Sequence, residues 1–165
     1  MSIHDEFVPP VLRGLSALSK ILGKAAAHCE ARKIDPAVLL AARLYPDMFT
    51  LTRQVQVACD MVRRGGNRLA ATEPANVTDD ETDIAALQAR IASTRDGLLA
   101  LKPADLAGAE TRTVTFPVRG GEMSMDGSAY LRNWVLPNFY FHCATAYGIL
   151  RHNGVELGKA DFLAG

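Results

Sequence analysis

His142 is the residue whose type and setting most favour chemistry, because a neutral imidazole can take up a proton, bind a metal ion or orient a ligand. It lies in a stretch where spacings of three and four residues place side chains on one face of a helix. Asn138 and Thr145 interrupt this otherwise apolar face on either side of His142. Pro137 removes one backbone donor and is expected to kink the helix beside them. This pattern favours a core histidine that is hydrogen-bonded to a neighbouring hydroxyl or amide, with a cavity at His142 as the alternative interpretation.

The helix that would carry His142 is predicted to extend from Asp126 to Gly154, as the last and longest helix of the chain. Asp126 is a favourable N-cap, and Gly154 suits the left-handed residue that ends a helix. Aromatic residues gather along it: Tyr130, Trp134, Phe139, Tyr140, Phe141 and Tyr147. We interpret them as core and subunit interface. The alternative is a small-molecule pocket lined by some of them, with Trp134 as a candidate.

Upstream elements are needed to position that helix. Apolar periodicity predicts helices over four segments, 8–30, 36–43, 51–69 and 80–101, of which the second is short. Pro9 and Pro10 are expected in the opening turn of the first helix, since proline is tolerated there. Thr50 is a predicted N-cap, and the spacing of Thr78 and Glu81 is that of a capping box. The chain is therefore predicted to be all-α, apart from one hairpin.

A polar loop and a hairpin separate the later helices. Residues 72–83 are polar, contain a proline and are predicted to be a loop linking two halves of the structure. Apolar and polar side chains alternate over residues 111–125, and Gly120 with Gly121 can supply a turn. Because an isolated pair of strands is marginally stable in water, we expect this hairpin to lie against the helices or a partner subunit.

Composition narrows the classes of function and location. The 165 residues are predicted to form one domain spanning 1–165, with 18 basic and 18 acidic side chains. This balance gives no support for binding nucleic acid or an acidic membrane surface. The N-terminal residues lack the signal-peptide pattern, and no apolar stretch is long enough to span a bilayer. Three cysteines without a CxxC pair, Cys29, Cys59 and Cys143, are expected to be buried and free, which favours a cytoplasmic location.

Three segments, PVLRGLSALSKIL, PDMFTLTRQVQVACD and LPNFYFHCATAYGILRHNGVELGKADFL, together resemble the DUF1993 branch of the DinB/YfiT-like superfamily. The resemblance covers nearly the whole chain. It implies a DinB-like antiparallel four-helix bundle, with a short extra helix and a small β-hairpin before the last helix.

The resemblance also implies a metal site. Typical members of the superfamily place one histidine on the second long helix and an HxxxH pair on the last, around a divalent metal ion. Three imidazoles with an open position suit zinc or nickel. Here His142 matches the second histidine of the pair, Asn138 stands at the first, and Gln54 is the nearest polar residue on the second helix. With one imidazole and two amides, we expect a degenerate site that binds zinc or nickel weakly at most.

Three hypotheses of function follow. The first is a small-ligand-binding or non-catalytic protein with a degenerate metal site, where His142, Asn138 and Gln54 form a polar cluster. The second is a divergent metal- or thiol-dependent transferase or hydrolase, since some DinB-like proteins resemble thiol-dependent S-transferases. The third is a structural homodimer whose aromatic surface serves association. A homodimer and a small molecule are thus the expected partners.

Overall fold

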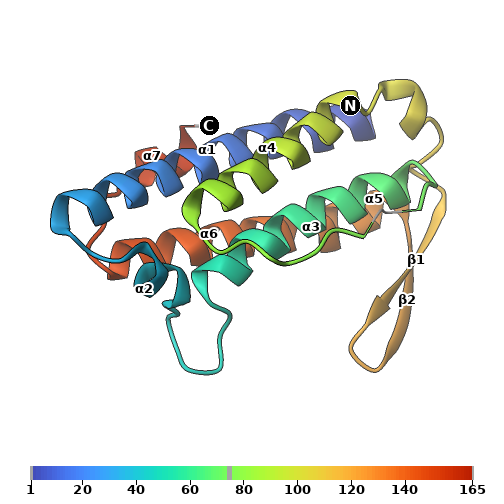
Figure 1. The fold of residues 1–165 in the computed structure, drawn as a ribbon. Coiled ribbons are helices and arrows are strands. Elements are labelled where there is room, and N and C mark those ends of the chain that lie inside the picture. Colours follow the sequence, from blue (N-terminus) through green and yellow to red (C-terminus); the bar gives the residue numbers. More distant parts are fainter. Residues whose placement is uncertain (1, 74–75, 165) are drawn as a thin grey trace.

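The computed structural model describes residues 2–73 and 76–164, and it is mainly helical with one small antiparallel sheet (Figure 1). The elements follow in this order: α1 (Ile3–Arg32), α2 (Pro36–Ala41), α3 (Leu51–Leu69), α4 (Ile84–Ala100), β1 (Thr113–Val118), β2 (Gly121–Asp126), α5 (Gly127–Tyr130), α6 (Leu136–His152) and α7 (Lys159–Leu163). A 3₁₀ turn, Pro103–Leu106, follows α4, and a π-helical segment, Leu131–Val135, joins α5 to α6. Within the described ranges, no helix combines the length and apolar character needed to cross a membrane.

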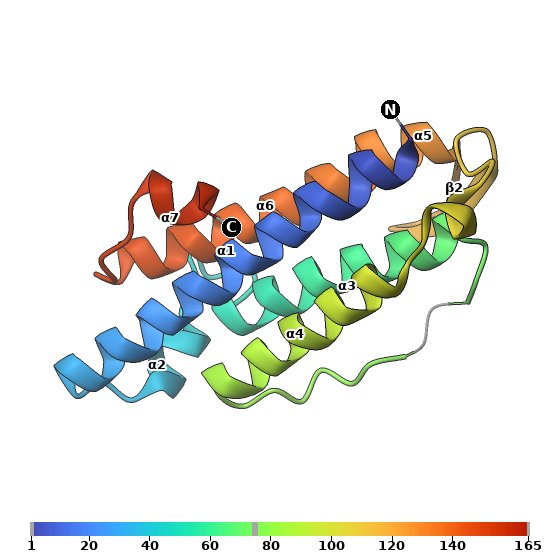
Figure 2. The ribbon, with the colours of Figure 1, turned by 90° about the horizontal axis from the view of Figure 1, so that it is seen from above.

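The long helices pack around a shared apolar core. Helix α3 contacts α4 and α6, and α1 also contacts both of them. Figures 1 and 2 show that α3 and α4 run in the same direction, while α1 and α6 run opposite to them. The antiparallel order expected throughout therefore does not hold for the α3–α4 pair.

The parallel α3–α4 pair explains the long polar connection between these helices. The 17 residues of α4 extend about 25 Å at ~1.5 Å per residue, so the chain leaving α3 must return over that length before α4 begins. The predicted loop makes this return: its described residues 76–83, here called the strap, run beside α3 and α4 (Figure 2). The strap is thus a structural consequence of the helix directions.

Helix α1 begins five residues before its predicted start, so Pro9 and Pro10 lie inside the helix and not in its opening turn. Ser2 caps the helix by accepting a hydrogen bond from the backbone N–H of Asp5 (3.2 Å). Proline inside a helix removes a hydrogen bond, which is why the sequence pattern favoured a later start. Phe7 is fully buried upstream of the prolines, and this packing stabilises the first turns.

The helix predicted over residues 126–154 is capped as predicted but is not regular. The Asp126 carboxylate accepts a hydrogen bond from the backbone N–H of Ala129 (2.8 Å). Residues 131–135 are then wound as a π-helix directly before α6. Pro137 has no N–H to donate and its ring would clash with the carbonyl four residues earlier, so a wider turn precedes it. The helix predicted over residues 126–154 is neither the longest nor the last: α1 has 30 residues, and α7 follows α6.

The predicted hairpin is present and lies against α5 and the π-helical segment that follows it. Strands β1 and β2 pair in antiparallel register, and Gly120 in the turn has a φ of 94°, a conformation that suits glycine. The buried Phe116 ring lies 4.8 Å from the ring of Tyr130 and 4.9 Å from that of Trp134. These contacts supply the packing that an isolated pair of strands lacks.

Gly127→Ala is expected to lower the free energy of unfolding by about 3 kcal/mol, because the added methyl group has no room. A Cβ at Gly127 would lie 1.9 Å from the carbonyl oxygen of Ala109, a backbone atom that cannot rotate away. Gly97→Ala is the matched control, since a Cβ there meets nothing within 4 Å and alanine is the better helix former. Urea denaturation measures both variants, and equal stabilities would contradict the packing described at Gly127.

Candidate functional site

His142 lies on α6 and is buried, with 8% of its surface exposed. Its Nδ1 atom lies 2.6 Å from Oε1 of Gln54, which belongs to α3 and is only 1% exposed. The packing of α3 against α6 therefore brings together two of the candidate residues that stand 88 positions apart in the sequence.

The hydrogen bonds of Gln54 determine which nitrogen of His142 carries the proton. Nε2 of Gln54 donates to the carbonyl oxygen of Phe49 (3.3 Å), so Oε1 is the atom that faces the histidine. An amide oxygen can only accept, and Nδ1 must therefore be the protonated nitrogen of the neutral ring. Nε2 of His142 has no protein partner within residues 2–73 and 76–164, and it keeps an available lone pair.

A cavity of about 210 Å³ adjoins His142, and Asp47 and Met48 are among its lining residues. The Phe49 ring lies nearly parallel to the imidazole, with centroids 6.3 Å apart, and the Phe141 ring meets it edge-on at 5.2 Å. The site thus offers one nitrogen acceptor among aromatic rings.

Burial lowers the pKa of His142, because an apolar environment disfavours the charged ring, and the positive charge of Arg53 lowers this pKa further. A histidine with a lowered pKa is neutral at neutral pH. Its accessible nitrogen is therefore a hydrogen-bond acceptor under these conditions, and the ring does not present a positive charge to a ligand.

The other candidate residues do not line this cavity. The Asn138 amide donates to the carbonyl oxygen of Trp134 (2.7 Å), and the Thr145 hydroxyl donates to that of Phe141 (2.7 Å). Short polar side chains in helices often donate a hydrogen bond to a backbone carbonyl oxygen of the preceding turn in this way. Trp134 packs against Phe116 of the hairpin instead. Only His142 and Gln54 of the five candidates meet at one site.

The residues around His142 do not fit a zinc or nickel centre of the expected kind. Such a site needs three donors with free lone pairs directed at one point. The oxygen of Gln54 already accepts from His142, and the Asn138 amide is turned toward the helix backbone. Within the described ranges, no three His, Cys, Asp or Glu side chains converge on a position that could hold an ion.

The cysteines are buried and free, as predicted. Burial raises the pKa of Cys59 to about 12, and burial also raises the pKa of Cys143. Because the thiolate is the nucleophilic form, neither side chain is a reactive thiol at neutral pH. The position of Cys143 next to His142 in the sequence therefore does not create a catalytic pair.

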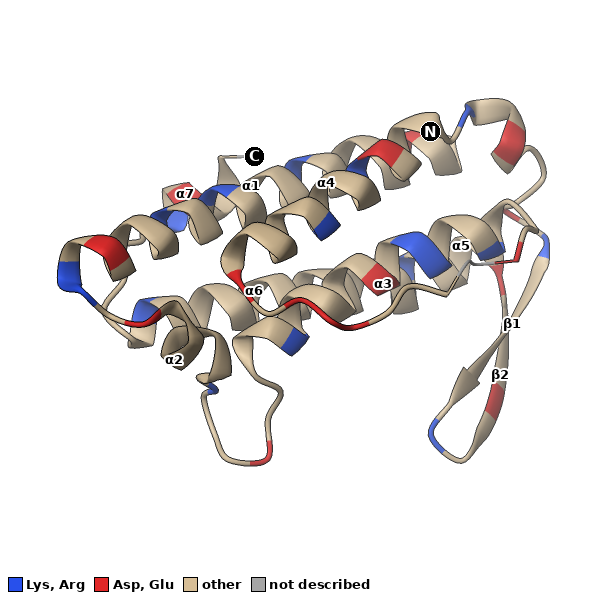
Figure 3. Ribbon diagram, viewed as in Figure 1, with Lys and Arg blue, Asp and Glu red and all other residues tan. Residues whose placement is uncertain are grey.

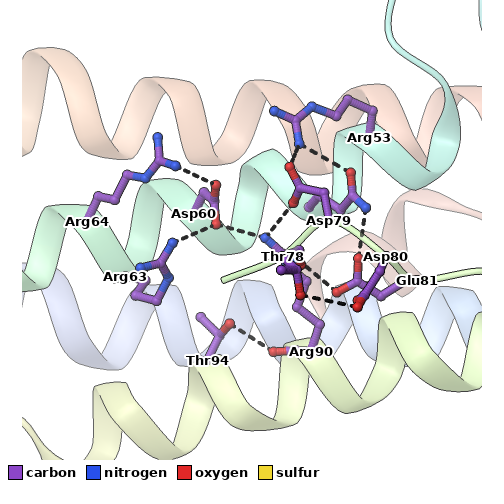
Figure 4. A network of polar contacts seen from close by, with 11 residues as sticks. Arg53, Asp60, Arg63, Arg64, Thr78, Asp79, Asp80, Glu81, Arg90 and Thr94 are labelled. Atoms are coloured by element: carbon purple, nitrogen blue, oxygen red, sulfur yellow. Dashed lines mark hydrogen bonds and ion pairs between the residues drawn. The ribbon is translucent and has the colours of Figure 1, made fainter. Parts of the chain in front are cut away.

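Arg90 forms a second polar site, where its guanidinium group joins α4 to α3 and the strap (Figure 4). Nη1 donates to the carbonyl oxygen of Thr78 (2.9 Å) and to the Glu81 carboxylate (2.8 Å). Nη2 donates to Asp60 (2.8 Å) and lies 3.0 Å from a carboxylate oxygen of Asp79. A buried guanidinium is stable only when it is paired in this way.

Further pairs extend this network on both sides. Asp60 also binds Arg63 (3.1 Å) and Arg64 (3.2 Å), and Asp79 binds Arg53. Figure 3 shows the acidic positions of the strap next to basic positions on α3. The acidic side chains of the strap thus hold it against α3 and α4 through ion pairs with arginines.

The sequence did not reveal this network. Thr78 and Glu81 were expected to form a capping box, but α4 begins later and its N-cap is Asp83. Glu81 binds Arg90 instead of the helix backbone. One feature of the sequence could have indicated it. Arg90 stands three residues after Leu87, and this spacing places an arginine on the apolar side of α4.

Comparison with known proteins agrees with the resemblance seen in the sequence. A family model described as a domain of unknown function, DUF1993, matches residues 3–163. The crystal structure of a DinB family member protein from Shewanella denitrificans is similar, with a TM-score of 0.92 and 41% identity over 99% of this chain and 92% of that chain. No curated protein matches the chain.

The acid stability of the protein is expected to depend on Glu81. Burial opposes ionisation of this carboxyl, but hydrogen bonds from Arg90 and Gln56 outweigh it, so the pKa lies below the usual 4.5. A pKa that is lowered in the folded state contributes stability above the unfolded-state pKa, and this contribution is lost as pH falls through the folded-state value. The loss should therefore begin near pH 4.5 and grow below it.

Glu81→Gln is expected to lower the free energy of unfolding at pH 7 by about 2 kcal/mol, because Arg90 loses a charged partner. The variant should also lose less stability than the wild type on acidification. Urea denaturation between pH 7 and pH 3 measures both effects, with the exposed carboxylate of Glu122 as the matched control in Glu122→Gln. An unchanged pH profile in Glu81→Gln would contradict the assignment.

Proposed function

Because the chain belongs to the DUF1993 family and shares its fold with a DinB family member protein, we propose that it is a DinB-like four-helix bundle that binds a small ligand at His142. The site is a degenerate form of the metal centre that the superfamily resemblance implies. Hydrogen bonding by one imidazole replaces coordination of zinc or nickel by three. The protein is non-catalytic in this proposal.

The accessible Nε2 of His142 is the observation that carries the proposal. Gln54 holds Nδ1 and so fixes both the tautomer and the orientation of the ring. Burial keeps the ring neutral, and a neutral ring with one occupied nitrogen has one acceptor left. An accessible acceptor without a protein partner among the described residues, at the edge of a cavity, favours a ligand that supplies a donor.

The lining of the cavity indicates the class of ligand. A volume of about 210 Å³ suits a small molecule. Phe49 and Phe141 favour an aromatic or apolar body, because their rings provide stacking and edge contacts. The ligand proposed is therefore a small, uncharged, mainly apolar molecule with one hydrogen-bond donor.

A metal- or thiol-dependent transferase or hydrolase has less support. The thiols of Cys59 and Cys143 are held in their protonated form by burial, and the donors near His142 are already engaged with one another. A catalytic role would require another means of generating a nucleophile. The free, buried thiols do support the proposed cytoplasmic location.

A homodimer is the second candidate, and exposed apolar side chains favour it. Tyr45 is 66% exposed and Phe141 is 57% exposed, with Leu44 and Phe49 also exposed in the same connection before α3. Large apolar side chains that gather on a surface are typical of an association site. Association through these residues would also cover the His142 cavity.

Phenol is expected to bind the wild type, because its hydroxyl can donate to Nε2 of His142 while its ring contacts Phe49 and Phe141. Anisole, which lacks the donor, should bind far more weakly. Titration followed by the ¹⁵N shift of His142 Nε2 measures this, and His142→Ala should abolish phenol binding. Equal binding of phenol and anisole would contradict the proposed role of the nitrogen.

His142→Ala should also lower the free energy of unfolding by about 1–3 kcal/mol, since the oxygen of Gln54 loses its donor. Thr145→Val is the matched control, because Thr145 is buried on the same helix outside the cavity. Metal analysis of untagged protein completes the test. Stoichiometric zinc or nickel that is lost in His142→Ala would overturn the degenerate-site proposal.

The mass of the wild type in solution is expected to be that of a dimer. Tyr45→Ser combined with Leu44→Ser should convert it to a monomer, because both changes remove exposed apolar surface. Leu99→Ser is the control, since Leu99 is 60% exposed on α4. Light scattering after gel filtration measures the mass, and a monomeric wild type would remove the dimer from consideration.

A further inference from the structure

A second hollow, of about 720 Å³, lies between α3, α4 and the strap, and its lining does not include His142. We call it the α3–α4 groove. Along α3 and its C-cap residue Ala70, the lining extends from Cys59 to Ala70, which corresponds to about 16 Å at ~1.5 Å per residue. Leu98 of α4 and Val77 of the strap add apolar surface. A hollow of this size is within the roughly 300–1,000 Å³ that ligand sites usually occupy.

Small residues keep the groove open. Helix α4 lines it with Ala89, Ser93, Gly97 and Ala100, which follow one another at helical spacings. A Cβ added at Gly97 would meet nothing within 4 Å. Alanine would therefore fit and would favour the helix, so the packing of the described residues does not explain a glycine at this position. A molecule bound in the groove would explain it.

The charged side chains around Arg90, at one end of the groove, are engaged with protein partners. All four terminal N–H groups of Arg90 face protein oxygens, in Thr78, Asp60, Asp79 and Glu81. The carboxylates beside Arg90 also have protein partners: Asp60 and Glu81 pair with Arg90, and Asp80 accepts a hydrogen bond from the Thr78 hydroxyl (3.2 Å) (Figure 4). A charged ligand would have to break these internal pairs, whereas an uncharged ligand would not.

The groove is also bounded by elements that are held in place. Arg90 fastens the strap to α4 at Thr78 and Glu81, and Gln56 of α3 donates to Glu81 (2.8 Å). The lining residues of the groove come from α3, α4 and the strap, so the hollow is bounded on more than one side and is not a flat surface. An elongated hollow of this volume suits a small molecule better than a folded partner.

From these observations we infer that the α3–α4 groove is a binding site for an elongated, uncharged, mainly apolar molecule of the long-chain alcohol type. Its chain would lie along Gly66, Gly97 and Leu98, and the paired charges at Arg90 would border its polar end.

Displacement of Nile red by 1-decanol tests this inference on the full chain. Gly97→Leu places a side chain in the open space and should weaken decanol binding about tenfold or more, while leucine supports the helix. Ala92→Leu is the matched control, because Ala92 is exposed on α4 and does not line the groove. It should bind decanol like the wild type, and thermal denaturation should show both variants folded.

Three results would overturn the inference. The first is failure of decanol to displace the dye from the wild type. The second is equal decanol affinity in Gly97→Leu and the wild type. The third is tighter binding of decanoate than of decanol, which would show that the paired charges do accept an anion.

Discussion

The pairing of Arg90 with buried carboxylates is the interaction on which this architecture depends. Because α3 and α4 run in the same direction, the chain must return beside them as a polar strap without regular secondary structure. Arg90 holds the strap through the Thr78 carbonyl oxygen and the Glu81 carboxylate, and it reaches α3 through Asp60. The same guanidinium group therefore fixes both the connection and the two helices it joins. Because Arg90 is buried, removal of Arg90 would leave Asp60 and Glu81 without this partner, and removal of either carboxylate would weaken the pairing of a buried charge.

The contact between His142 and Gln54 follows the same physical rule on a smaller scale. A polar side chain between packed helices needs a partner, and α3 supplies one to α6. The partner is an amide oxygen, so it takes up one ring nitrogen and leaves the other available. This single choice of residue favours hydrogen bonding to a ligand over coordination of a metal ion. The proposed function of the site rests on that chemistry.

Helix α3 connects the two polar sites. Gln54 faces the histidine, while Asp60, less than two turns further on, binds Arg90. Arg53 links them: it binds Asp79 of the strap, and its charge lowers the pKa of His142. The α3–α4 groove and the His142 cavity are thus separate hollows beside one helix. The ion pairs of Arg90 border the groove, and aromatic rings line the cavity.

Local features of this protein were determined by the sequence alone. The helix over residues 51–69, the caps Thr50 and Asp126, the hairpin and the burial of the cysteines depend on periodicity and on neighbouring residues, so they could be predicted. Tertiary structure alone decided the direction of α4, the early start of α1 and the partners of Arg90. It also decided that Gln54, and not Asn138, meets His142. These outcomes depend on contacts between residues that are far apart in the chain. A polar side chain can form its hydrogen bond with its own helix or with a residue on another helix. Local spacing does not distinguish these two solutions, because only the packed neighbours set their relative free energies.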